Sequence, residues 1–256
     1  MTETIERLDG EDGGAVFSGI PASGPLAWLD LGWRDFIRNA GASTGFGLIV
    51  VVAGYLIFGL TLDRPYLFLG AASGFFLLAP LLAAGLYEIS RRDALGDPAS
   101  FLGAISGLRP RVQSLADFGL VLVFAMICWQ MLSAFLFAFQ SKSSIGSMGS
   151  FGDNLFQAES AGFILGYIAV GGVVAAFVFM VSAISVPMIV DRNVDVVTAM
   201  MTSFRAVRAN PVAMFVWAAL LVTLTLIGFL TLMAGLAIIV PWLGHASWHA
   251  YKALVK

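Results

Sequence analysis

Long stretches of this 256-residue chain contain no ionisable side chain. The runs free of Asp, Glu, Lys, Arg and His cover residues 44–62, 65–87, 118–140, 160–190 and 211–244. A charge at the centre of a bilayer costs at least ~2.5 kcal/mol, so uncharged runs of this length are typical of membrane-spanning segments. Pumps, proton relays and voltage sensors carry ionisable residues inside their spans, and these clean runs disfavour such functions.

The composition favours a membrane location. Hydrophobic residues make up 59% of the chain and charged residues 12%, and the mean hydropathy is +0.90, values typical of a chain that a soluble fold could not keep hydrated. The net charge of −2 leaves no excess of basic residues for phosphate groups, so we expect no nucleic acid partner. Cys128 is the only cysteine, which excludes an intramolecular disulfide and a redox pair of cysteines.

Residues 1–24 differ from the rest of the chain. They hold five carboxylates against Arg7 alone, together with several glycines. The segment lacks the apolar stretch of a signal peptide, and its low hydrophobicity and net charge predict a disordered acidic tail. Residues 25–256 are then expected to form a single integral membrane domain.

We predict six membrane-spanning helices, because a span needs about 20 residues. Their expected bounds are 44–62, 66–89, 118–140, 161–190, 212–231 and 234–252. The fourth is long and must tilt, kink near Gly171-Gly172 or leave one end among the headgroups. As one helix, residues 211–244 would extend about 50 Å across about 30 Å of hydrocarbon, so we expect a turn near residues 231–235. A single span in this run remains the alternative.

The distribution of basic residues predicts the orientation. With six spans, every Lys and Arg except Arg64 and Lys142 falls on one side of the membrane. Cytoplasmic loops carry such an excess of basic residues, so both termini are predicted to face the cytoplasm. Five spans would weaken the bias, because Lys252 and Lys256 would then lie on the other side.

Short amphipathic segments precede the first, third and fifth spans. In the first segment, Leu29 and Phe36 fall on one helical face, while Asp35 and Arg38 lie on the opposite face. Ser100 is placed to cap the second segment. We expect these helices to lie on the cytoplasmic surface of the membrane, with basic and aromatic side chains as interfacial anchors. The predicted anchors are Trp28, Trp33, Arg34, Arg38, Phe204, Arg205, Arg208, Trp242 and Trp248.

The same features recur along the chain. Trp33-Arg34 with Asn39 matches Phe204-Arg205 with Asn210 at identical spacing, and the second span of each pair carries a proline. We therefore predict an all-α fold, a polytopic membrane helical bundle of six transmembrane helices in three hairpins, each preceded by a short cytoplasmic interfacial amphipathic helix. The alternative is that unrelated amphipathic helices resemble one another and that prolines are common in membrane helices.

Three stretches resemble a known family. They are residues 28–39, the sequence Gly85-Leu86-Tyr87-Glu88, and residues 244–251 near the C-terminus. These stretches are similar to a family of uncharacterised bacterial integral membrane proteins, some of whose members are labelled cytochrome c oxidase subunits. The resemblance implies a six-span protein of the bacterial inner membrane and no established activity. An oxidase catalytic subunit needs several histidines within its spans, and this chain has two in all.

Those two histidines are the first candidate for a site. His245 and His249 lie one helical turn apart and share a face, yet a histidine pair without a nearby carboxylate or cysteine is a weak metal site. We therefore expect no metal and no cofactor. Instead of ligating a metal, the two histidines would belong to an aromatic belt at the membrane boundary. If the repeats pack around a pseudo-threefold axis, a cytoplasmic pocket would form. Its predicted residues are Tyr87, Glu88, Arg91, His245, His249 and Tyr251.

No spacing in the sequence predicts a catalytic triad or a phosphate-binding loop. The sequence favours a non-catalytic membrane protein. Its expected role is that of an accessory, assembly or interaction component of a membrane complex, such as a respiratory complex. Its expected partners are membrane lipids and other membrane proteins. The alternative is a transporter or carrier for an uncharged or lipophilic solute, which would use polar side chains within its spans such as Gln130, Ser133 and Thr223. A membrane enzyme or haem protein that uses the histidine pair is a third hypothesis.

Overall fold

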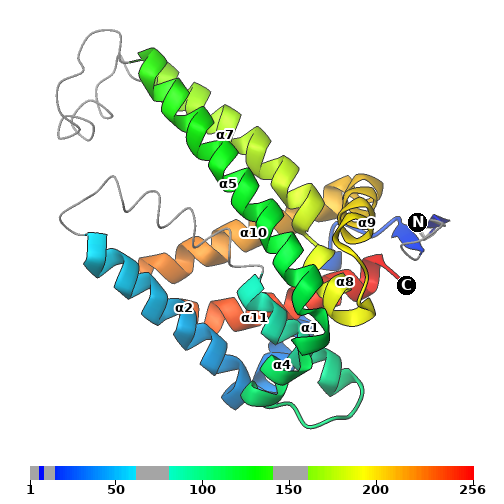
Figure 1. Ribbon diagram of the computed structural model, residues 1–256. Coiled ribbons are helices and arrows are strands. Elements are labelled where there is room, and N and C mark those ends of the chain that lie inside the picture. The colour runs from blue at the N-terminus through cyan, green and yellow to red at the C-terminus, as the bar shows by residue number, and fades with distance from the viewer. Residues whose placement is uncertain (1–5, 9–14, 62–80, 141–160) are drawn as a thin grey trace.

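The computed structural model describes residues 6–8, 15–61, 81–140 and 161–256. These residues are mostly helical, which confirms the all-α prediction at this level (Figure 1). The long helices are α2 (Ala40–Thr61), α5 (Val112–Gln140), α7 (Ala161–Ser182), α10 (Pro211–Leu230) and α11 (Leu236–Leu254). The shorter ones are α1 (Gly24–Arg38), α4 (Phe101–Gly107), η1 (Arg109–Arg111), α8 (Ser185–Arg192) and α9 (Val196–Ala209). Residues 81–94 form a further helix.

Four stretches of the described chain are long and apolar enough to cross a membrane. They are Ala40–Leu60, Phe101–Ser133, Leu165–Arg192 and Pro211–Leu230, which correspond to the first, third, fourth and fifth predicted spans. The second predicted span, 66–89, lies mostly outside the described residues. The sixth, 234–252, corresponds to α11, which is not among these four stretches. Two histidines and Lys252 make α11 less apolar than the others.

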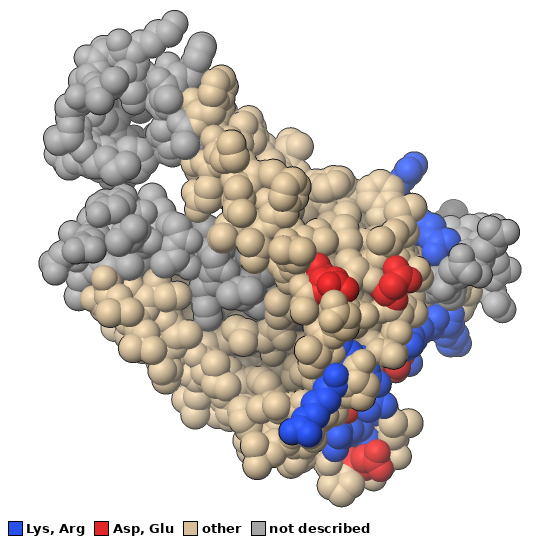
Figure 2. Space-filling model, in the orientation of Figure 1, with Lys and Arg blue, Asp and Glu red and all other residues tan. Residues whose placement is uncertain are grey.

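The short helices gather at one end of the molecule. In Figure 1, α5 and α7 run side by side toward the upper left, while α1, α4, α8 and α9 lie at the opposite end. Figure 2 shows the charged side chains of this face at that same end, while the long helices are covered by other residues. We call this part the charged end: helices α1, α4, α8 and α9 with the C-terminal turns of helix 81–94 and α11. Ser100 caps α4 as predicted, since its hydroxyl accepts a hydrogen bond from the Gly103 amide at 3.1 Å.

Helix α11 packs against both α1 and α2, and glycine permits the close approach on each side. A Cβ atom placed at Gly32 of α1 would lie 2.4 Å from the backbone nitrogen of Ala246. A Cβ atom at Gly47 of α2 would lie 2.2 Å from the carbonyl oxygen of Ala237. Because backbone atoms block both positions, a side chain at either one would push the helices apart. The C-terminal half of α11 is almost entirely buried by these neighbours.

The fourth apolar run breaks at residues 183–184, while α7 continues as a helix through Gly171-Gly172. Pro187 in the first turn of α8 has no N–H to donate to the carbonyl four residues earlier, which favours a break at this point. At the break, the Met180 carbonyl and the Ile184 amide bond to Ser203 of α9. The Ser203 hydroxyl donates to the Met180 carbonyl at 2.8 Å and accepts from the Ile184 amide at 3.4 Å. The run thus forms a long apolar helix followed by a short buried one.

The run 211–244 also breaks, at the predicted position. Helix α10 ends at Leu230 and α11 begins at Leu236. The intervening turn places Leu232 and Met233 at positive φ (54° and 67°), and the Thr231 hydroxyl accepts a hydrogen bond from the Gly235 amide at 2.7 Å. Two helices of ordinary length therefore replace the single helix of the alternative.

Within residues 1–24, for which a disordered tail is predicted, the structure describes residues 6–8 and 15–24. Strands β1 (Glu6–Leu8) and β2 (Val16–Ser18) pair antiparallel, and Val16 also bridges to Val255 at the C-terminus. Asn210 joins this segment to the helices, since its amide group donates to the Phe17 carbonyl at 2.6 Å and its side-chain oxygen accepts from the Ile20 amide at 3.0 Å. The acidic composition of the segment does not indicate these partners, because Asn210 and Val255 lie far along the chain from it.

The close approach of α1 and α11 gives a first prediction. Gly32→Ala should lower the free energy of unfolding by about 1–3 kcal/mol, because its methyl group meets the backbone of Ala246. Gly41→Ala is the matched control: its Cβ meets nothing within 4 Å, so helix propensity alone should make it neutral or stabilising by up to ~1 kcal/mol. Denaturant unfolding in mild detergent measures both, and equal effects of the two variants would contradict this packing.

Candidate functional site

The buried polar side chains of the charged end converge on the two histidines. His245 and His249 lie one turn apart in α11, on the side that faces α1, α2 and helix 81–94. His245 is fully buried. We call the group that surrounds them the polar hub: Asp35, Ser43, Ser90, His245 and His249.

Both ring nitrogens of His245 have serine partners. Nε2 lies 2.8 Å from the hydroxyl of Ser43 at the start of α2, and Nδ1 lies 2.7 Å from the hydroxyl of Ser90 on helix 81–94. Ser43 and Ser90 are themselves buried. Each of these four buried polar atoms therefore has a partner, as a water-excluded site requires. Neither ring nitrogen of His245 is left open to a ligand.

The chain of hydrogen bonds continues to Asp35 of α1. The Ser90 hydroxyl donates to Asp35 Oδ2 at 2.9 Å, and His249 Nε2 lies 2.8 Å from the same oxygen. Because Ser90 donates to Asp35, its oxygen accepts from Nδ1–H of His245. The hydrogen bonds thus place a proton on Nδ1 of His245, while Nε2 faces the Ser43 hydroxyl. The polar hub joins four helices through one continuous chain of bonds.

The electrostatics of Asp35 follow from these contacts. Burial by itself would raise the pKa of the Asp35 carboxyl, but the hydrogen bond from His249, the charge on that ring and the hydrogen bond from Ser90 hold this pKa below its ordinary value. Asp35 is therefore a carboxylate that its donors stabilise. The sequence pattern had placed Asp35 on the outer, polar face of its helix, and that prediction is wrong.

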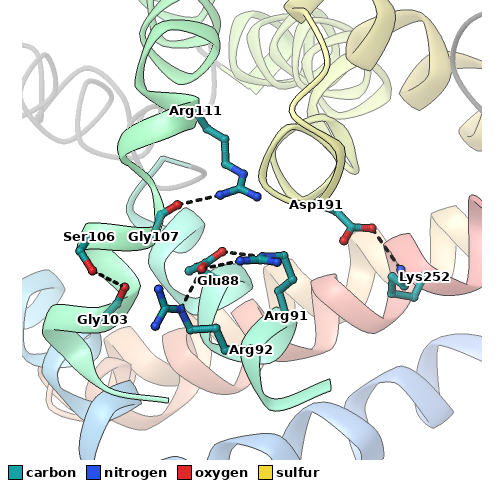
Figure 3. Close-up of polar contacts among 9 residues, drawn as sticks. All are labelled: Glu88, Arg91, Arg92, Gly103, Ser106, Gly107, Arg111, Asp191 and Lys252. Carbon is teal, nitrogen blue, oxygen red and sulfur yellow. Dashed lines mark hydrogen bonds and ion pairs between the residues drawn. The ribbon is translucent and has the colours of Figure 1, made fainter. Parts of the chain in front are cut away.

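A second polar group surrounds Glu88, whose side chain is fully buried. Its carboxylate accepts two hydrogen bonds from Arg91, at 2.7 and 2.8 Å, and one from Nε of Arg92 at 2.9 Å (Figure 3). The Glu88–Arg91 pair joins residues three positions apart on one helix, and it is bidentate. Gly107 of α4 faces the same carboxylate, since a Cβ placed there would lie 2.2 Å from Glu88 Oε1.

Tyr251 belongs to a third group at the end of α8. Its hydroxyl donates to Asp191 at 2.8 Å and accepts from Nε of Arg192 at 3.0 Å. Lys252 donates to the same Asp191 carboxylate at 3.1 Å. These contacts tie the C-terminal turn of α11 to α8.

The six residues predicted for one pocket therefore fall into separate groups. The histidines belong to the polar hub, Glu88 and Arg91 form an ion pair, and Tyr251 binds α8, while Tyr87 is buried in the core. Two shallow cavities lie elsewhere in the described chain, and none of the six residues lines them. A common pocket for these side chains stays a prediction.

The predicted anchors occupy two environments. Trp28 and Trp248 are buried, and Trp28 packs edge-to-face on Trp217 with ring centroids 5.6 Å apart. The side chains of Arg34 and Arg38 are 65% and 61% exposed, and they pair with Asp30 and Asp93 respectively. Arg208 is also exposed and stacks on Phe204. Trp33 is exposed, while Phe204, Arg205 and Trp242 have intermediate exposure. Lipid contact by any of these anchors stays a prediction.

Sequence reasoning missed Asp35, Ser43 and Ser90 as site residues. Each lies within a few residues of a helix end, where a polar side chain is common and by itself indicates no site. Their common signal is spatial: all three contact the histidine-bearing face of α11. Within the described residues, no group of three or more His, Cys, Asp or Glu side chains forms a site for a metal ion.

The fold and these contacts define a polytopic helical membrane protein with one polar, charged end. Comparison with known proteins agrees: residues 67–191, just under half of the chain, match the sequence model of a family described as predicted integral membrane protein (DUF2189). The chain is an integral membrane protein similar to that family over this part. This match does not show the bacterial origin or the link to cytochrome c oxidase that the sequence resemblance implied. No curated protein and no solved structure matches the chain.

The buried carboxylate gives a second prediction. Asp35→Ala leaves the donors of Ser90 and His249 without their acceptor, so the free energy of unfolding should fall by about 1–3 kcal/mol. Asp30→Ala, on the same helix, removes only an exposed ion pair with Arg34, and its cost should stay within about 1 kcal/mol. Unfolding in mild detergent at pH 7 compares the two variants. Equal losses would show that Asp35 is not held in a buried network.

The lowered pKa of Asp35 predicts how its contribution depends on pH. A carboxyl whose pKa is lower in the folded state stabilises the fold above its unfolded pKa of about 3.9 and loses that contribution as the pH falls through the folded pKa. The difference in unfolding free energy between wild type and Asp35→Asn should therefore persist above about pH 4 and shrink as the pH falls further. A difference that stays unchanged or grows below about pH 4 would contradict the assigned carboxylate.

Proposed function

We propose that this protein is a non-catalytic inner-membrane component that helps another integral membrane protein or complex to assemble or persist. The observation that carries the proposal is the polar hub. Its groups bind one another, and Ser43 and His245 are fully buried. Such groups fix helices in place, since a completely satisfied buried network rigidifies its surroundings.

The charged end provides an outer surface beside this rigid base. On α1, Leu26 and Ile37 are 58% and 59% exposed. Beside them a shallow cavity of about 310 Å³ is lined by Leu29, Asp30, Trp33 and Trp242. Trp33 and Trp242 pack edge-to-face there, with ring centroids 5.2 Å apart. Tryptophan beside exposed arginine is the composition found at the energetic centres of protein interfaces.

Several finer features belong to the same proposal. The excess of basic residues at the charged end supports its placement in the cytoplasm, with both termini on that side. The order of elements supports three related modules: α1 precedes α2, α4 precedes α5, and α9 precedes α10. Each module would pair an interfacial helix with a hairpin, and the bacterial inner membrane is the location that the sequence resemblance implies.

Affinity purification tests the proposal. The full chain, extracted in mild detergent from the membranes of its own organism, should retain a membrane protein in stoichiometric amount. Trp33→Ala should reduce this recovery about tenfold or more, since truncation of an interface tryptophan removes a large buried contact. Leu230→Ala, at the far tip of α10 with Leu230 83% exposed, is the matched control and should leave recovery unchanged. Recovery that is unaffected by Trp33→Ala, or no stoichiometric partner at all, would contradict the proposal.

A further inference from the structure

The three arginines around Glu88 exceed the negative charge that they meet. We call Glu88, Arg91, Arg92 and Arg111 the arginine cluster. In Figure 3 the guanidinium group of Arg111 points toward the Glu88–Arg91 pair. Three guanidinium groups thus lie close to one buried carboxylate. Asp191 does not balance the excess by itself, because its carboxylate already accepts from Tyr251 and Lys252.

The cluster also has unused hydrogen-bond donors. Both oxygens of Glu88 are taken by Arg91 and by Nε of Arg92, and Arg111 donates through Nη1 to the Gly107 carbonyl at 2.7 Å. Among the described residues, Nε of Arg111 is a buried donor with no acceptor. A buried donor without a partner is costly, so this position favours a ligand that brings oxygen acceptors.

Local structure holds these side chains in place. The side chains of Arg91 and Arg92 are only 22% and 25% exposed, so the ion pairs with Glu88 fix their directions. Helix α4 can lie over them because it presents glycine: a Cβ at Gly103 would lie 3.1 Å from Nη1 of Arg92, and one at Gly107 would lie 2.9 Å from Nη2 of the same arginine. The cluster is thus a preorganised set of donors rather than three mobile surface arginines.

The surroundings place this cluster at the edge of the apolar region. On α4, Leu102 and Ile105 are 76% and 47% exposed, and Val112 at the start of α5 is 57% exposed. Apolar side chains beside converging arginines are typical of the layer where a protein meets lipid headgroups. Arginine is the residue best suited to bind a tetrahedral oxyanion through several N–H groups at once.

We propose that the arginine cluster binds a phosphate group, carried by an anionic phospholipid at the charged end. Arg111 supplies the unpartnered donor, Arg92 supplies its free Nη groups, and Glu88 holds Arg91 and Arg92 in position without neutralising the cluster. This site goes beyond the proposed function and does not depend on a protein partner. All of its residues fall within the part of the chain that matches the membrane protein family.

Native mass spectrometry of the full chain tests the site, with the protein released from detergent containing phosphatidylglycerol or phosphatidylcholine. Wild type should retain one phosphatidylglycerol in preference to phosphatidylcholine. Arg111→Gln should lower that retention about tenfold. Arg109→Gln is the matched control, because Arg109 is exposed on η1 two residues away and lies outside the cluster. Arg92→Gln is a second cluster variant, which leaves the bidentate Arg91–Glu88 pair intact should Arg111→Gln fail to fold.

Inorganic phosphate separates the two sources of the ligand. Phosphatidylglycerol that stays bound in 10 mM phosphate and is lost only in the cluster variants supports a lipid site. Stabilisation of wild type by inorganic phosphate alone, absent in Arg111→Gln, supports a phosphate site but assigns it to a free anion. Equal retention by Arg111→Gln, Arg92→Gln and Arg109→Gln, or equal binding of phosphatidylcholine, overturns the proposal.

Discussion

The structure depends on the way in which α11 is held between α1 and α2. Glycines at Gly32 and Gly47 bring the three helices into backbone contact, and the polar hub closes the space between them at the charged end. The two features require each other. Close approach excludes water from His245 and Asp35, and a buried polar group without water needs protein partners. The hydrogen bonds of the hub in turn fix the orientation of α11 that the glycines permit.

The sequence predicted the features of the fold that depend on lipid and on local chemistry. Uncharged runs located four stretches suited to cross a membrane, and helix length predicted the turn at residues 231–235. The break before α8 was missed, because its cause lies partly in Ser203 on another helix. The ordered segment around Val16 was missed for the same reason, since its partners lie at the opposite end of the chain.

The candidate site was predictable only in part, for a physical reason. Spacing along a helix determines pairs such as Glu88 with Arg91 and the shared face of His245 and His249. It does not determine which helix covers that face. The amphipathic pattern of α1 predicted that Asp35 lies on a polar surface. In the structure that face of α1 contacts α11, and Asp35 is buried against His249. Residues from four helices meet in the hub, and no periodicity within one helix encodes such a meeting.

The packing of the charged end therefore depends on the coupling between α1 and α11 through Asp35 and His249. A double-mutant cycle measures that coupling directly: Asp35→Ala, His249→Ala and the double variant, each unfolded by denaturant in the same mild detergent at pH 7. A direct hydrogen bond between the two side chains predicts a coupling free energy of about 1 kcal/mol or more. Effects that add to within about 0.3–0.5 kcal/mol would show that the two residues do not interact, and would contradict the hub as the contact that holds α11.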